Sequence, residues 1–361
     1  MNKKKRNIVF SIVGIIIVII YIIISATPLG KEIEFQPQWT LSITSKPQGG
    51  ITSNTKIFPF QLGQNLGYFT EKGTIVKLIS YPFQGTISHK YWSTYSPDVQ
   101  NIEIYSTNSV SQETPEPDFS INSSGFPFIS DTRLYVFTPS GYGFESYSET
   151  GEKLWGFEGY APIISFNSSV GGVAVGYADG SLYSFTPKGE LQQEFIPGGS
   201  KYPIILGVAI SNSGNQVACV SGIDSQRFVL TQEKNGLHKV VFHTYLEGNL
   251  RSPAMVKFSQ DEKRVYFACN EGLGVVDCET YENTILSIKG KILAIEESPD
   301  INTTFVLSKV PTGFRISLIE NATNIIGSFF YKAESSFITV ANDSLYIGKD
   351  TEISKILLTK K

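Results

Sequence analysis

The stretch Leu134–Phe157, LYVFTPSGYGFESYSETGEKLWGF, has the pattern of three short strands separated by two tight turns. Its first strand is rich in β-branched and aromatic residues, and a glycine-bearing turn follows it. Glycine suits this turn because it adopts the positive φ that a short hairpin requires. The stretch therefore predicts an antiparallel meander as the structural unit of the chain.

Weaker copies of the first strand and its turn recur along the chain. Their first residues are Leu66, Leu134, Val173, Val217, Val265, Phe305 and Leu345. The first interval, from Leu66 to Leu134, is 68 residues, whereas the others range from 39 (Leu134 to Val173) to 48 (Val217 to Val265). A repeat of about 40–45 residues made of short strands is typical of β-propellers, in which each repeat forms one four-stranded blade. Seven copies predict an all-β, seven-bladed β-propeller.

One segment of the unit points to a family. Tyr147–Trp155, YSETGEKLW, resembles the TGxxxW segment of pyrroloquinoline-quinone-type (PQQ-like) propeller repeats, which are similar to BamB-like and WD40-like repeats. Leu182–Phe185, followed by Lys188 and Gly189, looks like the same strand and turn in a degraded form. Such repeats occur in quinoprotein dehydrogenases and in BamB-like outer-membrane assembly factors. The resemblance covers roughly residues 36–361, and we place the propeller domain at residues 38–361.

The N-terminus has the pattern of a membrane anchor. A basic tail, residues 1–7, precedes an almost unbroken apolar run, residues 8–25. As a helix this run would be about 27 Å long, close to the ~30 Å hydrocarbon core of a bilayer. It predicts an uncleaved transmembrane signal-anchor helix. The alternative is a cleaved signal peptide, for which Ile24 is an awkward residue three positions before the cleavage site.

The charge of the tail predicts the orientation of such an anchor. Cations at residues 1–7 favour a cytoplasmic N-terminus. We therefore expect a single-pass protein of the inner (cytoplasmic) membrane. A linker at residues 26–37 would then lead to the propeller on the periplasmic, or extracytoplasmic, side.

The predicted propeller begins with a strand that has no partners and ends with a repeat that is one strand short. Residues 38–43 read as a strand without partners of its own, and they place Trp39 where Trp155 stands in the fuller repeat. The last copy supplies only three strands before the chain ends. We expect the N-terminal strand to complete the seventh blade as its outer strand, which closes the ring and removes two exposed edges.

The long first interval predicts an insertion of roughly 28 residues, which we place at about residues 91–125. This region contains an aromatic cluster that we single out as a candidate partner-binding edge: Tyr91, Trp92, Tyr95 and Tyr105. Long loops often carry function. The alternative is that these side chains pack along the outer strand and cover the blade.

The sequence offers little for catalysis or for a metal. His238 and His243 lie five residues apart on a predicted strand and should face opposite sides, and His89 is remote from both. The three cysteines have no metal-like spacing and predict buried free thiols, with a disulfide as the alternative: Cys219, Cys269 and Cys278. Quinoprotein enzymes typically have an adjacent Cys-Cys pair and a Ca²⁺ site, and the sequence matches neither. We expect no catalytic residues, no cofactor and no metal site.

The balance of charge bears on the partner. The formal net charge is −3, and the four cations Lys3, Lys4, Lys5 and Arg6 leave −7 on the rest of the chain, which argues against nucleic acid. The leading hypothesis is a membrane-anchored, non-enzymatic scaffold that binds other envelope proteins, and the resemblance to BamB implies a role in envelope protein assembly. The alternative is a ligand-binding sensor or an enzyme that uses the central channel, where Lys257 and Glu296 are charged exceptions on the predicted inner strands. An adhesin-like surface module is a third hypothesis.

Overall fold

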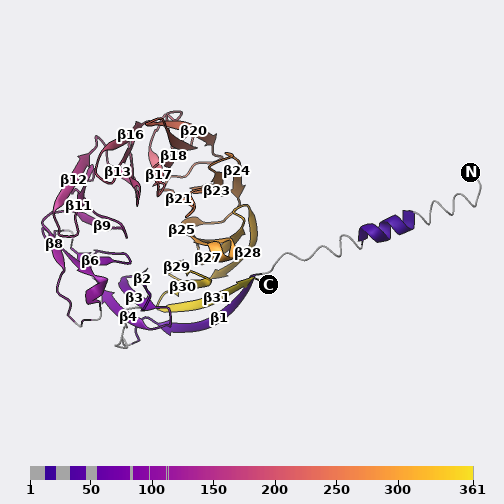
Figure 1. The fold of residues 1–361 in the computed structure, drawn as a ribbon, viewed down its shortest axis with the longest axis horizontal. Coiled ribbons are helices and arrows are strands. Elements are labelled where there is room, and N and C mark those ends of the chain that lie inside the picture. The colour runs from indigo at the N-terminus through magenta and orange to yellow at the C-terminus, as the bar shows by residue number, and fades with distance from the viewer. Residues whose placement is uncertain are drawn as a thin grey trace, which may run out of the picture.

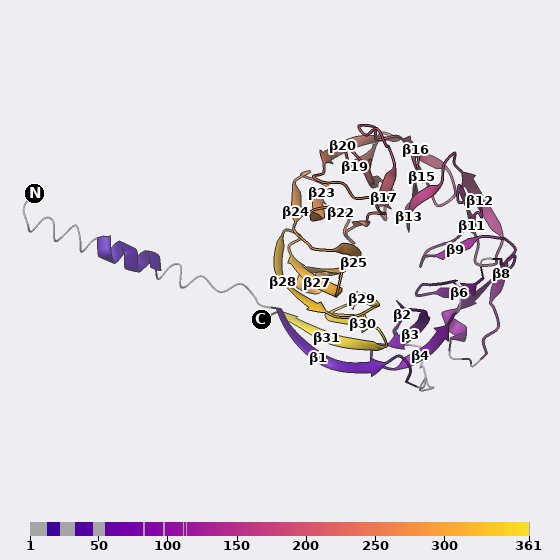
Figure 2. The ribbon, with the colours of Figure 1, turned by 180° about the vertical axis from the view of Figure 1, so that it is seen from behind.

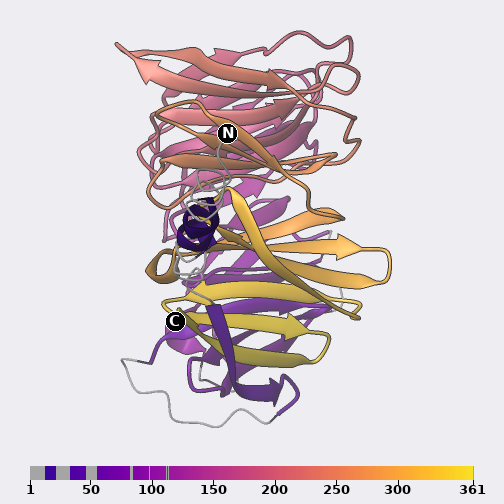
Figure 3. The ribbon, with the colours of Figure 1, turned by 90° about the vertical axis from the view of Figure 1, so that its right-hand side faces the viewer.

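The computed structural model describes residues 13–21, 33–45, 55–81, 84–96, 98–110, 112 and 114–360. Within these residues, eight antiparallel sheets stand around a central axis as the blades of a propeller (Figure 1). The chain passes around the ring once, and its C-terminal strand lies beside its N-terminal strand (Figure 2). Seen from the side, the strands of successive blades are stacked at different tilts (Figure 3).

Strands are numbered along the chain, and each blade is given from the centre outward. Blade 1 has β2 (Ile57–Leu62), β3 (Asn65–Thr70) and β4 (Ile75–Ser80); blade 2 has β5 (Gln84–Ile87), β6 (Tyr91–Tyr95), β7 (Ile102–Ser106) and β8 (Phe119–Ile121); blade 3 has β9 (Phe126–Ile129), β10 (Leu134–Phe137), β11 (Gly143–Tyr147) and β12 (Lys153–Glu158); blade 4 has β13 (Ile163–Ser169), β14 (Gly172–Tyr177), β15 (Leu182–Phe185) and β16 (Leu191–Phe195).

The second half of the ring is built in the same way. Blade 5 has β17 (Ile205–Ile210), β18 (Gln216–Ser221), β19 (Arg227–Lys234) and β20 (Leu237–Tyr245); blade 6 has β21 (Val256–Phe258), β22 (Arg264–Cys269), β23 (Gly272–Asp277) and β24 (Asn283–Leu286); blade 7 has β25 (Lys291–Ser298), β26 (Thr303–Val310), β27 (Gly313–Glu320) and β28 (Asn324–Tyr331); blade 8 has β29 (Ser336–Ala341), β30 (Ser344–Lys349), β31 (Glu352–Lys360) and β1 (Ile33–Ser42). Two short 3₁₀ helices, η1 (Thr107–Ser109) and η2 (Pro299–Ile301), lie in connections.

The N-terminal strand closes the ring, as the sequence predicts. β1 pairs antiparallel with β31 from Ile33 opposite Lys360 to Ser42 opposite Glu352, with a bulge between Pro37 and Trp39. It is the outermost strand of its sheet. The strand begins at Ile33, within the stretch expected to be linker. The predicted closure is therefore confirmed, although it completes an eighth blade instead of a seventh.

Two tryptophans attach an outer strand to the following blade in the same way. Trp39 Nε1 donates to the carbonyl of Glu71, and Trp155 Nε1 donates to the carbonyl of Pro187, both at 3.3 Å. Each indole lies against a glycine of the contacted turn, since a Cβ on Gly73 would approach the Trp39 ring to 2.8 Å. The predicted equivalence of the two tryptophans is confirmed. It also identifies the β3–β4 turn as the counterpart of the β15–β16 turn.

This correspondence explains why the predicted blade number is wrong. Leu66 lies in β3, which matches the third strand of blade 4, whereas the other copies were aligned on second strands. The 68 residues before Leu134 therefore contain the end of blade 1 and all of blade 2. The insertion predicted at residues 91–125 is the greater part of blade 2. Its β6–β7 connection, residues 96–101, has the sequence SPDVQN without the glycine that marks other blades.

With β3 as a third strand, the repeat is regular around the whole ring. Consecutive third strands begin between 37 residues (Asn65 to Ile102) and 45 residues (Leu182 to Arg227) apart. Their first residues are Asn65, Ile102, Gly143, Leu182, Arg227, Gly272, Gly313 and Glu352. Eight units of this length account for the described propeller without an insertion.

Aromatic side chains fill the spaces between neighbouring blades. At the junction of blades 8 and 1, the ring of Tyr346 lies 4.9 Å from that of Phe58 and 5.4 Å from that of Phe69. Between blades 5 and 6, Phe228 stacks on Phe267 at 4.2 Å. All five side chains are buried. Burying a large apolar side chain contributes about 1.5–3 kcal/mol, so these contacts hold adjacent blades together.

The predicted transmembrane helix is not found. Among the described residues, no helix is long and apolar enough to cross a membrane. Residues 13–21 are helical. The basic tail at residues 1–7, the flanks of the apolar run at residues 8–12 and 22–25, and residues 26–32 of the expected linker lie outside the described residues.

The tryptophan contact predicts the effect of substituting its glycine. Gly73 (φ +83°) lies under the Trp39 ring, whereas Gly141 (φ +73°) has nothing within 4 Å of a built Cβ. Gly141→Ala should cost only the backbone strain of a positive φ, about 1–2 kcal/mol. Gly73→Ala should cost about 1–3 kcal/mol more, because the indole must move. Urea denaturation of both variants measures the difference, and equal losses would contradict the contact.

Candidate functional site

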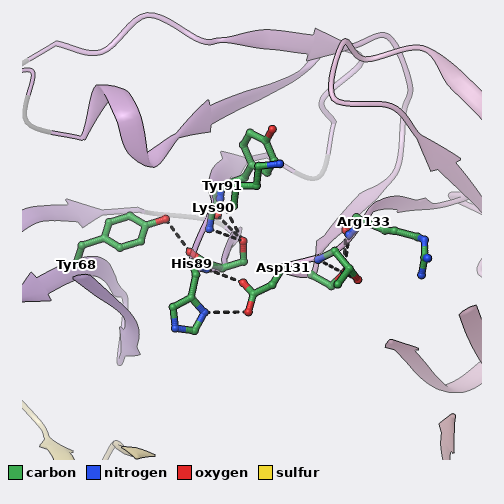
Figure 4. A network of polar contacts seen from close by, with 9 residues as sticks. Tyr68, His89, Lys90, Tyr91, Asp131 and Arg133 are labelled. Atoms are coloured by element: carbon green, nitrogen blue, oxygen red, sulfur yellow. Dashed lines mark hydrogen bonds and ion pairs between the residues drawn. The ribbon is translucent and has the colours of Figure 1, made fainter. Parts of the chain in front are cut away.

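The turn between β9 and β10, residues 130–133, connects three blades on one face of the ring, and we call it the Asp131 turn (Figure 4). Toward blade 2 it presents Asp131 to His89 of the β5–β6 turn. Toward blade 4 it presents Arg133 to the β13–β14 turn. It is the candidate site because it gathers charged and titratable side chains from separate repeats.

Asp131 accepts two hydrogen bonds from His89. His89 Nδ1 donates to Oδ2 at 2.9 Å, and the backbone N–H of His89 donates to Oδ1 at 2.7 Å. The side-chain bond, together with the backbone bond, holds the pKa of the Asp131 carboxyl below its usual range. Both side chains are about half exposed (55% and 54%), so the pair contributes less than about 1 kcal/mol to stability.

A buried tyrosine fixes the position of the His89 turn. The Tyr68 hydroxyl, on β3 of blade 1, donates to the carbonyl of Ser88 at 2.9 Å (Figure 4). Burial, with a smaller contribution from the Asp131 charge, raises the pKa of Tyr68, so its hydroxyl remains a donor. The Ser88 Oγ accepts from the backbone N–H of Tyr91 at 3.1 Å. Blades 1, 2 and 3 are thus joined through one chain of hydrogen bonds.

Arg133 extends this chain to blade 4. Its Nη2 donates to the carbonyl of Val170 at 2.8 Å, and its Nη1 donates to the carbonyl of Ser169. The guanidinium therefore satisfies two carbonyls of the β13–β14 turn. An Arg supplies such a fork of donors, which a Lys could not reproduce.

Two depressions lie on either side of the Asp131 turn. The outer one has a volume of about 240 Å³ and is lined by Lys90, Tyr91, Arg133, Tyr147 and Leu154, among others. Lys90 forms an ion pair with Glu149 there. The inner one is more open, about 460 Å³, and its lining includes His89 and Asp131 with hydroxyl and amide side chains of blades 3 to 5.

Among the described residues, the hydrogen bonds around His89 do not form a nucleophilic triad. A triad would need a hydroxyl or thiol hydrogen-bonded to the second ring nitrogen of His89. The hydrogen bonds found in the described part of the chain place none there, and Ser130 Oγ donates to the carbonyl of Arg133 at 3.0 Å. No group of three or more metal-ligating side chains occurs among the residues that the structure describes.

Carboxylates in the equivalent turn of blade 6 and near the end of β25 in blade 7 link other blades on the same face. Glu262 of blade 6 accepts from the backbone N–H and the Oγ of Ser213 in blade 5, both at 2.6 Å. Glu297 of blade 7 accepts from the backbone N–H of Gln260 at 2.8 Å and from the Tyr266 hydroxyl at 2.9 Å. Asp131 therefore belongs to a series of contacts between neighbouring blades.

The structure places the four aromatic residues of the predicted partner-binding edge in blade 2. Tyr91 and Trp92 on β6 are buried, and Trp92 stacks on Tyr105 of β7 at 4.2 Å. Tyr95 is half-buried and contacts Phe126 of blade 3 edge-on, at 6.5 Å between centroids. The four residues contribute to packing within blade 2 and to blade 3. Their role in binding a partner stays a prediction.

Two charged residues of the inner strands meet in a way that the sequence did not reveal. Lys257 of β21 lies 3.3 Å from Glu296 of β25 and also donates to the carbonyl of Ile295. They lie on different strands 39 residues apart, so only the placement of blades 6 and 7 brings them together. The pair adds a charged link between blades 6 and 7.

Burial affects the ionisation of His238 and of the cysteines. His238 lies on β20, and burial lowers its pKa, so it is neutral at pH 7. All three cysteines are free and buried, as the sequence predicts. Burial raises the pKa of both Cys219 and Cys278 to about 12, which leaves little thiolate at neutral pH.

Comparison with known proteins identifies the family. A family model described as beta-propeller protein matches residues 1–360. This chain belongs to that family. An uncharacterized protein of Treponema pallidum (strain Nichols) is 28% identical over 365 residues, which cover 99% of this chain and 95% of the relative.

Two solved structures share the propeller fold. BamB from Moraxella catarrhalis superposes with a TM-score of 0.60 at 13% identity, covering 90% of this chain and 100% of BamB. The computationally designed Ika8 protein superposes with a TM-score of 0.62 at 12% identity, covering 86% and 95%. At such identities the similarity concerns the fold alone. The predicted resemblance to BamB-like propellers is confirmed at that level.

The His89–Asp131 pair predicts a pH-dependent contribution to stability. Because the pKa of Asp131 is lower in the folded protein than in the unfolded chain, its contribution is complete above about pH 4 and lost as pH falls through the folded value. Asp131→Asn should destabilise by less than about 1 kcal/mol at pH 7, and by less at pH 3 than at pH 7. Urea denaturation at both pH values, with the exposed Asp98→Asn as control, tests this. A loss that persists unchanged at low pH would contradict it.

The buried cysteines predict slow thiol chemistry. Native protein at pH 8 should react with a disulfide reagent such as dithionitrobenzoate far more slowly than unfolded protein, which should expose all three thiols. Absorbance at the thionitrobenzoate band measures both rates. Fast labelling of the native protein would show that at least one cysteine is accessible.

Proposed function

We propose that this chain is a non-enzymatic, protein-binding scaffold of the cell envelope, located on the extracytoplasmic side and resembling BamB in its role in envelope protein assembly. The similarity to BamB supports the fold of such a scaffold.

The observation that carries the proposal is a band of exposed apolar side chains on consecutive blades, which we call the tyrosine rim. It consists of Tyr160, Ile196, Tyr202 and Tyr245, of which Tyr160 is 92% exposed and the others at least 60%. Tyr160, Ile196 and Tyr202 lie in the connections that follow β12 and β16, and Tyr245 ends β20. Figure 1 shows these three outer strands side by side on the rim.

Exposed aromatic residues in such a group are typical of interfaces. Single exposed apolar residues are ordinary, but tyrosines that share one region offer large, rigid contact area with a polar tip. The face that carries the Asp131 turn is less available to a partner. Many of its charged side chains already form hydrogen bonds with neighbouring blades. The rim is the surface left for a partner.

The test is co-purification from gently solubilised envelopes with and without the rim. The full chain should capture envelope proteins, and the triple variant Tyr160→Ala, Tyr202→Ala, Tyr245→Ala should lose them while its unfolding midpoint stays unchanged. A control variant, Ile326→Ala with Phe330→Ala, replaces exposed residues on β28 of blade 7. Equal capture by all three proteins, or capture of nothing, would contradict the proposal. A small molecule that co-purifies instead would favour ligand binding in the central channel.

A further inference from the structure

We propose that the free edge of β20 binds an extended, acidic segment of a partner protein by strand addition, so that the segment becomes a fifth strand of blade 5. This inference rests on the scaffold function and names the site and the chemistry of the partner. It is argued from the edge, the charge and the side-chain pattern of β20.

β20 is a long, open strand. It is the last strand of its sheet, and it runs over nine residues from Leu237 to Tyr245. Backbone donors and acceptors along such an edge can pair with another chain unless the edge is short or shielded. Leu237, Val240 and Tyr245 are exposed by 64%, 44% and 60%, so apolar side chains accompany these backbone groups. Tyr245 also belongs to the tyrosine rim, which makes the two surfaces continuous.

The strand itself carries one basic side chain that is charged at neutral pH. β20 contains Lys239 and two histidines and no Asp or Glu; Lys234 ends the preceding strand β19, and Glu233 and Glu247 lie just outside the stretch from Lys234 to Leu246. The chain outside its basic tail carries a net −7. The exposed ammonium of Lys239 attracts an acidic side chain of a partner and disfavours pairing with a second copy of the same strand.

The other outer strands do not share this combination. β1, β12 and β16 each carry a carboxylate, at Glu34, Glu158 and Glu194. β8 and β24 are three and four residues long. β28 is uncharged, and on β4 the Lys77 Nζ donates to the carbonyl of Gln112 at 2.6 Å. Among the described outer strands, β20 alone is long, cationic and without acidic residues.

The side-chain pattern defines the complementary segment. Along β20, exposed Leu237 is followed two residues later by Lys239, and His243 by Tyr245, while Val240 between the two pairs is also exposed. A bulge opposite Leu230 and Thr231 separates the two halves. Since residues on one face of a sheet pair with their cross-strand neighbours, the partner should place acidic and apolar side chains at alternate positions of one face.

The experiment uses the full chain and a peptide that alternates glutamate with valine and threonine over the length of β20. Fluorescence anisotropy gives the affinity, and hydrogen exchange shows which amides become protected. The acidic peptide should bind, more weakly at high salt, and should slow exchange in β20. Lys239→Glu should weaken binding about tenfold, whereas the equal charge change Lys289→Glu, on an exposed residue of blade 6, should not.

Two further peptides separate strand addition from charge attraction. A peptide of the same length and pattern with lysine in place of glutamate should not bind. An acidic peptide of equal charge with proline at alternate positions should bind poorly, because it cannot donate to a ladder. Equal binding of the proline peptide, protection outside β20, or no binding of the acidic peptide would overturn the inference. Co-purification through the tyrosine rim would stand in each case, so failure here is distinct from failure of the scaffold function.

Discussion

A ring of blades holds together only if its first and last blades meet, and the pairing of β1 with β31 provides this junction. The two strands are more than three hundred residues apart in sequence, yet they pair along nearly their whole length, and Thr40 Oγ1 lies 2.8 Å from Ser354 Oγ. Without β1, the edge of β31 would be open and the aromatic contacts of Phe58 and Phe69 with Tyr346 would lose the cover of Trp39. Closure by β1 therefore covers both the edge of β31 and the aromatic core between blades 8 and 1.

The same contacts recur between other blades and explain how the repeat serves the ring. Indoles attach outer strands to the next blade, aromatic rings fill the space between sheets, and turn carboxylates accept hydrogen bonds from the preceding turn. On the face that carries the Asp131 turn, many polar groups are therefore hydrogen-bonded within the protein. The tyrosines of the rim and the outer edge of β20 remain exposed, and these are the surfaces at which we propose that partners bind.

Much of the fold could be predicted because its causes are local. Strand-turn periodicity indicates a propeller, and Trp39 indicates closure, since an indole at that point needs a turn on the next blade. The blade number could not be obtained from glycine turns, because blade 2 lacks one. Another signal was present: an apolar residue followed by a serine whose backbone N–H closes the next turn, at Ser88, Ser130, Ser211 and Ser259. Ser88 marks blade 2.

The candidate site was harder to predict. His89 and Asp131 lie 42 residues apart in different repeats, and nothing near either residue signals the other. Their pairing depends on the angle between blades 2 and 3, which long-range packing sets. The aromatic cluster of blade 2 was misjudged for a different reason. Tyr91 and Trp92 fall in what the sequence suggested was a long loop, but they lie on a strand of blade 2, where they are buried. The apolar run at residues 8–25 likewise predicted a membrane helix that the described residues do not contain.

The closure is tested most directly by cross-linking its two strands. In a variant with Thr40→Cys and Ser354→Cys, the new thiols would face each other across β1 and β31, while the three native cysteines remain buried. Mild oxidation should give an intramolecular disulfide that speeds migration on a non-reducing gel and is absent from either single variant. Intermolecular disulfides, or none, would show that the N-terminal strand does not complete the last blade.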